Sequence, residues 1–252
     1  MSLSTVAFGS GLSSLLIVLI GWILGLYMLK RYFSSPDNNT LALAVILISV
    51  GSVWSAITVN FFIALTSSST PVYLDQIPYL MLVGWIPGVV GLATGYVFIS
   101  IVKEEYLKPT LFIFGLFFII NTVIIYVFIP FNLFGFKVDD ALQFSAQMAG
   151  ELPDASTKGY FLILSVISIL IMLATSIFFI LTAIRTNIPL VKTRAGLLGV
   201  GLLLIGLLMP FDSVIETNDL LILLTVRILI VISLFILAMA ITLPKRIFKN
   251  LA

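Results

Sequence analysis

Residues 220–243 read LLILLTVRILIVISLFILAMAITL, a run of 24 residues in which Arg227 is the single charge. An α-helix needs about 20 predominantly apolar residues to cross the hydrocarbon core of a bilayer. The run therefore predicts a membrane-spanning helix. Arg227 is the residue in it that most needs an explanation, because a charge inside a span is costly.

Six further segments of the same kind precede this run. The seven spans are expected at about 12–29, 41–65, 78–102, 110–129, 160–184, 195–211 and 220–243. The composition agrees, with 61% hydrophobic and 10% charged residues, where a soluble domain carries about 25% charged residues. The expected fold class is all-α, a polytopic membrane protein in which residues 1–252 form a single seven-transmembrane helix bundle.

The charged residues are sorted between the two sets of helix ends. Of the 13 Lys and Arg residues, ten lie on one side and most acids lie on the other. The positive-inside rule places the basic side in the cytoplasm. The protein is therefore predicted to lie in the cell membrane with its N-terminus outside the cell and its C-terminus in the cytoplasm. The basic side consists of Lys30, Arg31, Lys103, Lys108, Arg185, Lys192, Arg194, Lys245, Arg246 and Lys249.

The longest connection, residues 130–159, is predicted to be external. Within it, residues 138–149 carry apolar side chains at helical spacing. A short interfacial helix or a lid over the mouth of the bundle is one expectation. An ordinary ordered loop is the other.

Arg227 is predicted to pair with Asp212. Arg227 lies 18 residues before the basic-side Lys245, and Asp212 lies 18 residues after the basic-side Arg194. Both counts correspond to about 27 Å at about 1.5 Å per helical residue. Glu216 and Asp219 are the alternative partners. The pair is expected to act either as a switch that couples an outside event to helix motion or as a structural clamp between the last two helices.

Four glycines mark the third predicted span. Gly84, Gly88, Gly91 and Gly95 are spaced by four, three and four residues, so they lie on one helix face. Such a stripe predicts close helix packing, or else a moving helix that admits a ligand. Pro87 should kink the same span. A second, weaker instance is Gly21 with Gly25 in the first span.

Several spans also contain polar residues well inside the apolar run. Asn60, Asn121, Ser165 and Ser168 are the main examples. They are expected either to hydrogen-bond between helices and to their own carbonyls, or to line a cavity.

Most catalytic chemistry is not expected. The chain has no His and no Cys, which removes imidazole bases, thiolate nucleophiles and the usual soft metal ligands. No acid pair lies in mid-span, and the last span has no Lys that could hold retinal. We therefore expect no enzyme, no cofactor and no metal site, and no basic block indicates binding to nucleic acid.

The last two spans resemble a known group. Residues 194–196, 209–212, 224–230 and 241–245 look like those of archaeal seven-helix orphan proteins, which are loosely similar to the seven-helix sensor regions found ahead of some histidine kinases. The resemblance implies a sensory membrane module and carries over no functional residues beyond the Asp212 and Arg227 positions.

Three functions are kept open. The first is a receptor-like or sensory protein of unknown ligand, with its mouth at residues 130–159 and at the Arg227–Asp212 region. The second is a small-molecule or lipid transporter with a cavity among spans two, three, five and seven. The third is a non-catalytic structural subunit of a membrane complex. The expected partners are the lipid bilayer and a membrane or cytoplasmic protein.

Overall fold

The protein is mainly α-helical. The computed structural model describes residues 3–67, 73–102, 107–131, 133–137, 142–144, 152, 155–214 and 220–242. Its elements are α1 (Thr5–Ser34), α2 (Asn38–Ser52), α3 (Ser55–Thr66), α4 (Gln76–Val83), α5 (Ile86–Val102), α6 (Leu107–Val123), the π-helix η2 (Ile124–Phe128), the 3-10 turn η3 (Leu133–Gly135), β1 (Leu142–Phe144), β2 (Ala155–Thr157), α7 (Gly159–Arg185), α8 (Pro189–Val214) and α9 (Leu220–Thr242).

The long helices have the length and composition of membrane spans. Six helical segments of the described chain could each cross a bilayer, and α2 with α3 adds a seventh if that bent pair forms one span. These helices indicate a multi-pass membrane protein, and they confirm the prediction of a helical membrane bundle at this level. Lipid is then the solvent of the outer surface, which explains why large apolar side chains such as Ile23, Phe112 and Ile163 are exposed.

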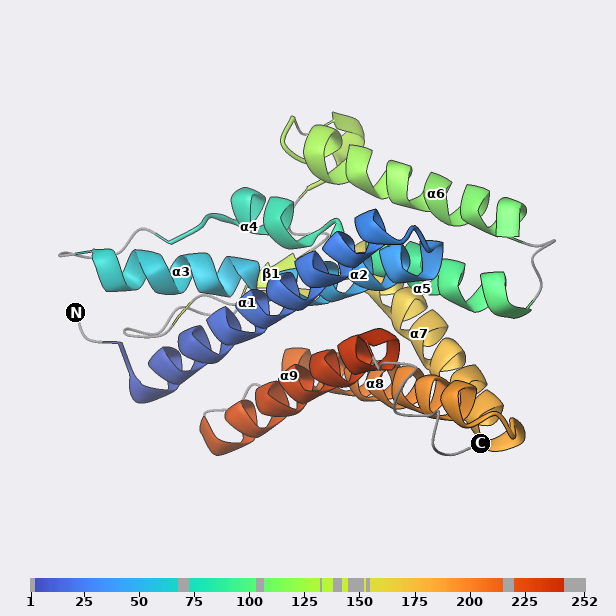
Figure 1. Cartoon of the computed structure of the whole chain (residues 1–252). Coiled ribbons are helices and arrows are strands. Elements are labelled where there is room, and N and C mark those ends of the chain that lie inside the picture. Colours follow the sequence, from blue (N-terminus) through green and yellow to red (C-terminus); the bar gives the residue numbers. More distant parts are fainter. Residues whose placement is uncertain are drawn as a thin grey trace.

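Six helical segments close a ring, and α6 lies outside it. Following the contacts around the ring, α1 packs on α2, α2 on α5, α5 on α7, α7 on α8, α8 on α9, and α9 returns to α1. Apolar side chains including Ile17, Leu47, Ile205 and Leu234 fill the middle. The helix α6 packs mainly against α5 and stands apart in Figure 1.

The second predicted span is broken, whereas the sequence predicted one helix over 41–65. The helices α2 and α3 meet at a bend of 42°. The bend follows Gly51 and Ser52, and Gly/Ser pairs are a recognised cause of sharp helix kinks. At the bend, Val53 N–H donates to the Val50 carbonyl, three residues back, at 3.2 Å, so the last turn of α2 is tightened.

The third span is interrupted where Pro87 predicts a kink. The helix α4 ends at Val83 and α5 begins at Ile86. Proline has no N–H to donate to the carbonyl four residues back, and its ring clashes with that carbonyl. For Pro87 the affected carbonyl belongs to Val83, the last residue of α4, so the helix is interrupted at the place where a kink was predicted.

Two helices start earlier than predicted. The helix α1 begins at Thr5 rather than near Leu12 because Ser4 caps it, and the Ser4 Oγ accepts a hydrogen bond from Ala7 N–H at 3.0 Å. The helix α8 begins at Pro189 rather than near Ala195. Proline at the first helical position loses no internal hydrogen bond and has the right φ angle.

The connection between η2 and α7 contains the 3-10 turn η3 and two short strands where it is described. Residues 142–144 form β1, which pairs antiparallel with β2 through Leu142 opposite Thr157 and Phe144 opposite Ala155. The predicted interfacial helix over 138–149 is therefore wrong at these three residues. Their apolar–polar–apolar order, Leu-Gln-Phe, suits the two-residue period of a strand. The rest of 138–149 lies outside the described residues.

The glycine stripe does allow close approach, toward two different neighbours. A Cβ on Gly84 would lie 2.6 Å from Ile125 Cδ1, and one on Gly91 would lie 2.9 Å from Ser168 Oγ. Gly88 faces Phe118, where a Cβ would lie 3.1 Å from Cδ2. Gly95 has ordinary space, with its nearest neighbour 3.8 Å from a built Cβ. The packing interpretation is confirmed at Gly84, Gly88 and Gly91.

The tightest backbone approach lies instead between α1 and α2. A Cβ on Gly21 would lie 2.7 Å from Gly51 Cα and 2.9 Å from the Leu47 carbonyl oxygen. These are backbone atoms, which cannot move aside like the end of a flexible side chain. The pattern around Gly21 looked weak in the sequence because its partner, Gly51, lies on another helix.

Substitution of Gly21 should separate backbone contact from helix propensity. We expect Gly21→Ala to destabilise the protein by about 1–3 kcal/mol through overpacking, despite the gain of up to about 1 kcal/mol in helix propensity. Gly95→Ala is the matched control and should be neutral or stabilising. Thermal unfolding in detergent measures both, and equal melting temperatures for the two variants would contradict this account of the α1–α2 contact.

Candidate functional site

Arg227 is buried in α9 and paired with an acid on α8. The Arg227 Nε donates to Asp212 Oδ1 at 3.1 Å, and the two side chains are 3% and 8% exposed. The predicted pair is confirmed. The alternative partners, Glu216 and Asp219, lie outside the described residues. The helix α8 runs past Pro210 to Val214, so Asp212 lies inside the helix and not after it.

The other side of the guanidinium is held by serines of α1. Arg227 Nη1 lies within hydrogen-bond distance of the Ser10 carbonyl oxygen (2.6 Å), Ser10 Oγ (3.0 Å), Ser13 Oγ (3.1 Å) and Ser14 Oγ (2.8 Å), and these four acceptors share its two hydrogens. Three hydroxyls and one carbonyl thus solvate a charge that lipid could not.

These serines were not among the predicted site residues. The first span was predicted to start at about Leu12, which left Ser10 outside the helix. The signal was present in the spacing, because Ser10, Ser13 and Ser14 are three and four residues apart and therefore share a helix face. The Ser4 cap that brings Ser10 into the helix is also visible in the sequence.

Asp212 has a second partner at the bend between α2 and α3. Its Oδ2 accepts a hydrogen bond from Trp54 Nε1 at 2.7 Å. Trp54 is itself buried and stands between the two helices, with φ −92° and ψ 8°. The indole N–H therefore links the bend of the second span to the ion pair. Together, Ser10, Ser13, Ser14, Trp54, Asp212 and Arg227 form what we call the arginine network.

The arginine network joins helices that are far apart in the sequence. It connects α1, the α2–α3 bend, α8 and α9 through donors and acceptors that satisfy one another. Removing one partner of a buried pair typically costs about 3–5 kcal/mol, because the other charge remains buried. The network is consequently suited to holding or releasing helices.

The predicted mid-span polar residues form hydrogen bonds, and two of them support the interrupted third span. Asn121 Nδ2 donates to the Gly84 carbonyl at 3.0 Å, and Ser168 Oγ donates to the Pro87 carbonyl at 2.5 Å. Neighbouring helices commonly satisfy backbone groups beside a break in a membrane helix. These bonds hold α6 and α7 against the break.

Asn60 and Ser165 form hydrogen bonds to backbone groups away from this break. Asn60 Oδ1 accepts from Leu74 N–H at 2.9 Å, and Ser165 Oγ donates to the Phe161 carbonyl of its own helix at 2.9 Å. The hydrogen-bonding interpretation is confirmed for Asn121, Ser165 and Ser168, whereas Asn60 binds the backbone of the segment that precedes α4. A cavity lined by them stays a prediction, and none of them lines the pocket described next.

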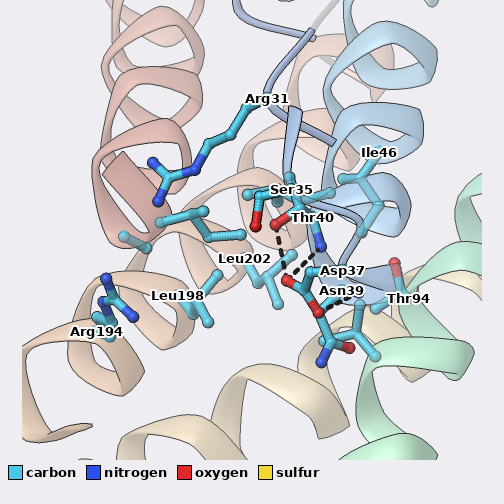
Figure 2. A pocket seen from close by; sticks show the side chains of 14 residues that line it. Arg31, Ser35, Asp37, Asn39, Thr40, Ile46, Thr94, Arg194, Leu198 and Leu202 are labelled. Carbon is cyan, nitrogen blue, oxygen red and sulfur yellow. Dashed lines mark hydrogen bonds between the residues drawn. The ribbon is translucent and has the colours of Figure 1, made fainter. Parts of the chain in front are cut away.

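A pocket of about 340 Å³ lies at the other end of α1, near the basic residues. Its walls come from α1, α2, α5, α8 and α9, and Arg31, Asp37, Thr94 and Arg194 are among its polar residues (Figure 2). Ser14 and Arg31 are separated by roughly 25 Å along α1 at about 1.5 Å per residue. The pocket and the arginine network therefore occupy opposite ends of the bundle.

Comparison with known proteins adds no functional residue. No model of a known protein family matches the chain, and no curated protein matches it. Among the described residues, no group of three or more Asp and Glu side chains could hold a metal ion. The roles of the site residues therefore follow from their contacts and burial in the structure.

Paired substitutions should show that the ion pair acts as a unit. We expect Arg227→Met alone to destabilise the protein by about 3–5 kcal/mol, because Asp212 would remain buried without its counter-charge. The double variant Arg227→Met/Asp212→Leu should recover much of that loss. Thermal unfolding of the wild type, both single variants and the double variant gives the coupling energy, and purely additive effects would argue against a coupled pair.

Proposed function

We propose that the chain is a receptor-like, sensory membrane protein with seven spans, its N-terminus outside and its C-terminus in the cytoplasm. The observation that carries this proposal is the arginine network, which ties one end of four helical segments to a single buried charge. The ligand and the protein partner are left open by this proposal. The readout would be helix motion passed to a partner at the basic face.

The seven-span topology follows when each interrupted span is counted once. The bent pair α2–α3 then crosses the membrane once, α4–α5 forms one interrupted span, and α1, α6, α7, α8 and α9 supply the other five crossings. Lys30 and Arg31 near the end of α1, Arg185 at the end of α7, and Lys192 and Arg194 in the first turns of α8 then share one side. The positive-inside rule makes that side cytoplasmic.

Coupling would work through discrete rearrangement. The network has an all-or-none character, because a guanidinium that leaves Asp212 must find other partners inside the bundle. Loss of the Asp212 contact to Trp54 would free the α2–α3 bend, and α2 runs from that bend to the pocket at the basic end. A contact with two alternative arrangements can amplify a small displacement at a ligand site into a shift of a whole helix.

Cysteine labelling tests the topology. The chain contains no Cys, so single substitutions at the exposed Lys158 and Lys192 introduce unique labels. In intact cells, a membrane-impermeant maleimide should react with Lys158→Cys and should reach Lys192→Cys only after the membrane is permeabilised. Labelling of both residues from the same side would refute an odd number of crossings between the N-terminal end of α7 and the start of α8.

Spin labels at the basic end test the coupling itself. Labels at Phe33→Cys on α1 and Lys192→Cys on α8 report the distance between two exposed positions far from Arg227. With Arg227→Leu added, we expect the distance distribution to move by about 2 Å or more, the scale of helix shifts in known switches. A folded variant with an unchanged distribution would make the pair a clamp and remove the support for sensing.

A transporter is the second candidate, favoured by one specific observation. Two spans are interrupted, and interrupted helices commonly form substrate sites in transporters. Transport requires alternating access, so Thr94→Cys in the pocket should then react with small reagents from both sides of the membrane. Reaction from the basic side alone would favour the sensory proposal.

A further inference from the structure

We infer that the pocket at the basic end binds a phosphate group carried on an apolar body, with Arg31 and Arg194 as its charged partners. This inference does not depend on the sensory proposal. It rests on the cavity, on the two arginines at its wall, and on a buried hydroxyl beside it.

The two arginines come from different helices. Arg31 extends from the last turn of α1 and Arg194 from α8, and Figure 2 shows both guanidinium groups on the same side of the pocket. Among the described residues, the Arg31 guanidinium makes no hydrogen bond or ion pair. A planar guanidinium presents paired N–H donors that match phosphate oxygens. Two such groups on one wall favour an anion with several acceptor oxygens.

The acid in the pocket is occupied elsewhere. Asp37 caps α2, and its carboxylate accepts from Asn39 N–H at 3.3 Å, from Thr40 N–H at 3.1 Å and from the Thr40 hydroxyl at 2.7 Å. Its charge interacts favourably with the N-terminus of α2. The dashed lines in Figure 2 show that Asp37 turns toward α2. The residues that line the pocket thus include two cations and one acid, whose carboxylate is directed at α2.

Thr94 supplies the second, independent observation. Its side chain is completely buried and lines the pocket from α5, and its Oγ1 has no hydrogen-bond partner among the described residues. Helical threonines in this protein normally donate to the carbonyl four residues back, as Thr58 does to Trp54 and Thr175 does to Ile171. A buried hydroxyl without a partner is costly, and a ligand oxygen would satisfy it.

The remaining wall is apolar and limits the size of the ligand. Leu43, Ile46, Val97, Leu198 and Leu202 surround the polar residues. A volume of 340 Å³ lies at the lower end of the range of about 300–1,000 Å³ for small-molecule sites. It accommodates a phosphate with a glycerol unit and a few carbons, but not two complete acyl chains. Both a lipid headgroup and a soluble phosphate ester have this chemistry.

Binding to the purified protein in neutral detergent tests the inference. The probes are short-chain phosphatidic acid, short-chain phosphatidylcholine, glycerol 3-phosphate and a fatty acid of matched chain length. We expect phosphatidic acid to bind more tightly than phosphatidylcholine and the fatty acid. Binding of glycerol 3-phosphate as well would identify a soluble ester as the source, and its failure to bind would identify the lipid headgroup. Fatty acid binding equal to that of phosphatidic acid would overturn the phosphate assignment.

Variants locate the binding in the pocket. Arg31→Gln and Arg194→Gln should each weaken phosphatidic acid binding about tenfold, equivalent to about 1.4 kcal/mol, and Thr94→Val should weaken it severalfold. Arg31→Lys should retain part of the affinity. Arg185→Gln, an exposed arginine at the end of α7 that does not line the pocket, is the matched control.

The control decides between a site and a charged surface. Equal losses in Arg185→Gln and Arg31→Gln would mean general attraction of anionic lipid to a basic face, and would refute a site. Unchanged phosphatidic acid affinity in Arg31→Gln, Arg194→Gln and Thr94→Val would also refute a site. Melting temperatures close to that of the wild type establish that each variant is folded, and Arg31→Lys replaces Arg31→Gln if the latter is not.

Discussion

One buried cation is the constraint on which this structure depends. In a bundle solvated by lipid, no bulk water accepts hydrogen bonds from a buried guanidinium, so its five N–H donors need acceptors within the protein. Arg227 Nε and Nη1 find acceptors on two helices at once, in Asp212 of α8 and in the serines of α1. The α1–α9 contact that closes the ring of helices therefore includes a buried charge, in a molecule whose core is mainly apolar.

The two interrupted spans show the same requirement applied to the backbone. Pro87 and the Gly51–Ser52 pair break regular helices, and polar groups beside each break find partners on neighbouring helices. Asn121 and Ser168 bind backbone carbonyls at the break near Pro87. At the break after Ser52, the indole N–H of Trp54 binds Asp212. The α2–α3 bend is thus part of the arginine network, and a movement of Asp212 would displace or break its hydrogen bond to Trp54 at that bend.

The two ends of the bundle differ in chemistry. At one end the polar groups of the arginine network bind one another, which favours a stable contact with a high cost of opening. At the other end Arg31 and the Thr94 hydroxyl are without protein partners among the described residues, which favours binding. The helices α1, α8 and α9 contribute to both ends, so a ligand at one end and the ion pair at the other act on the same rigid elements.

The sequence by itself determined that long apolar helices form, that the helix is interrupted near Pro87, and that Arg227 pairs with an acid of the preceding segment, with Asp212 as the first of three candidates. These depend on local composition, on the missing proline N–H and on depth counted along a helix. Only the tertiary structure decided that Ser10, Ser13, Ser14 and Trp54 complete the network, that α6 lies outside the ring, that 142–144 is a strand, and that a pocket forms at the basic end. These outcomes depend on which helix faces meet, and residues as distant as Ser10 and Arg227 become neighbours only through packing.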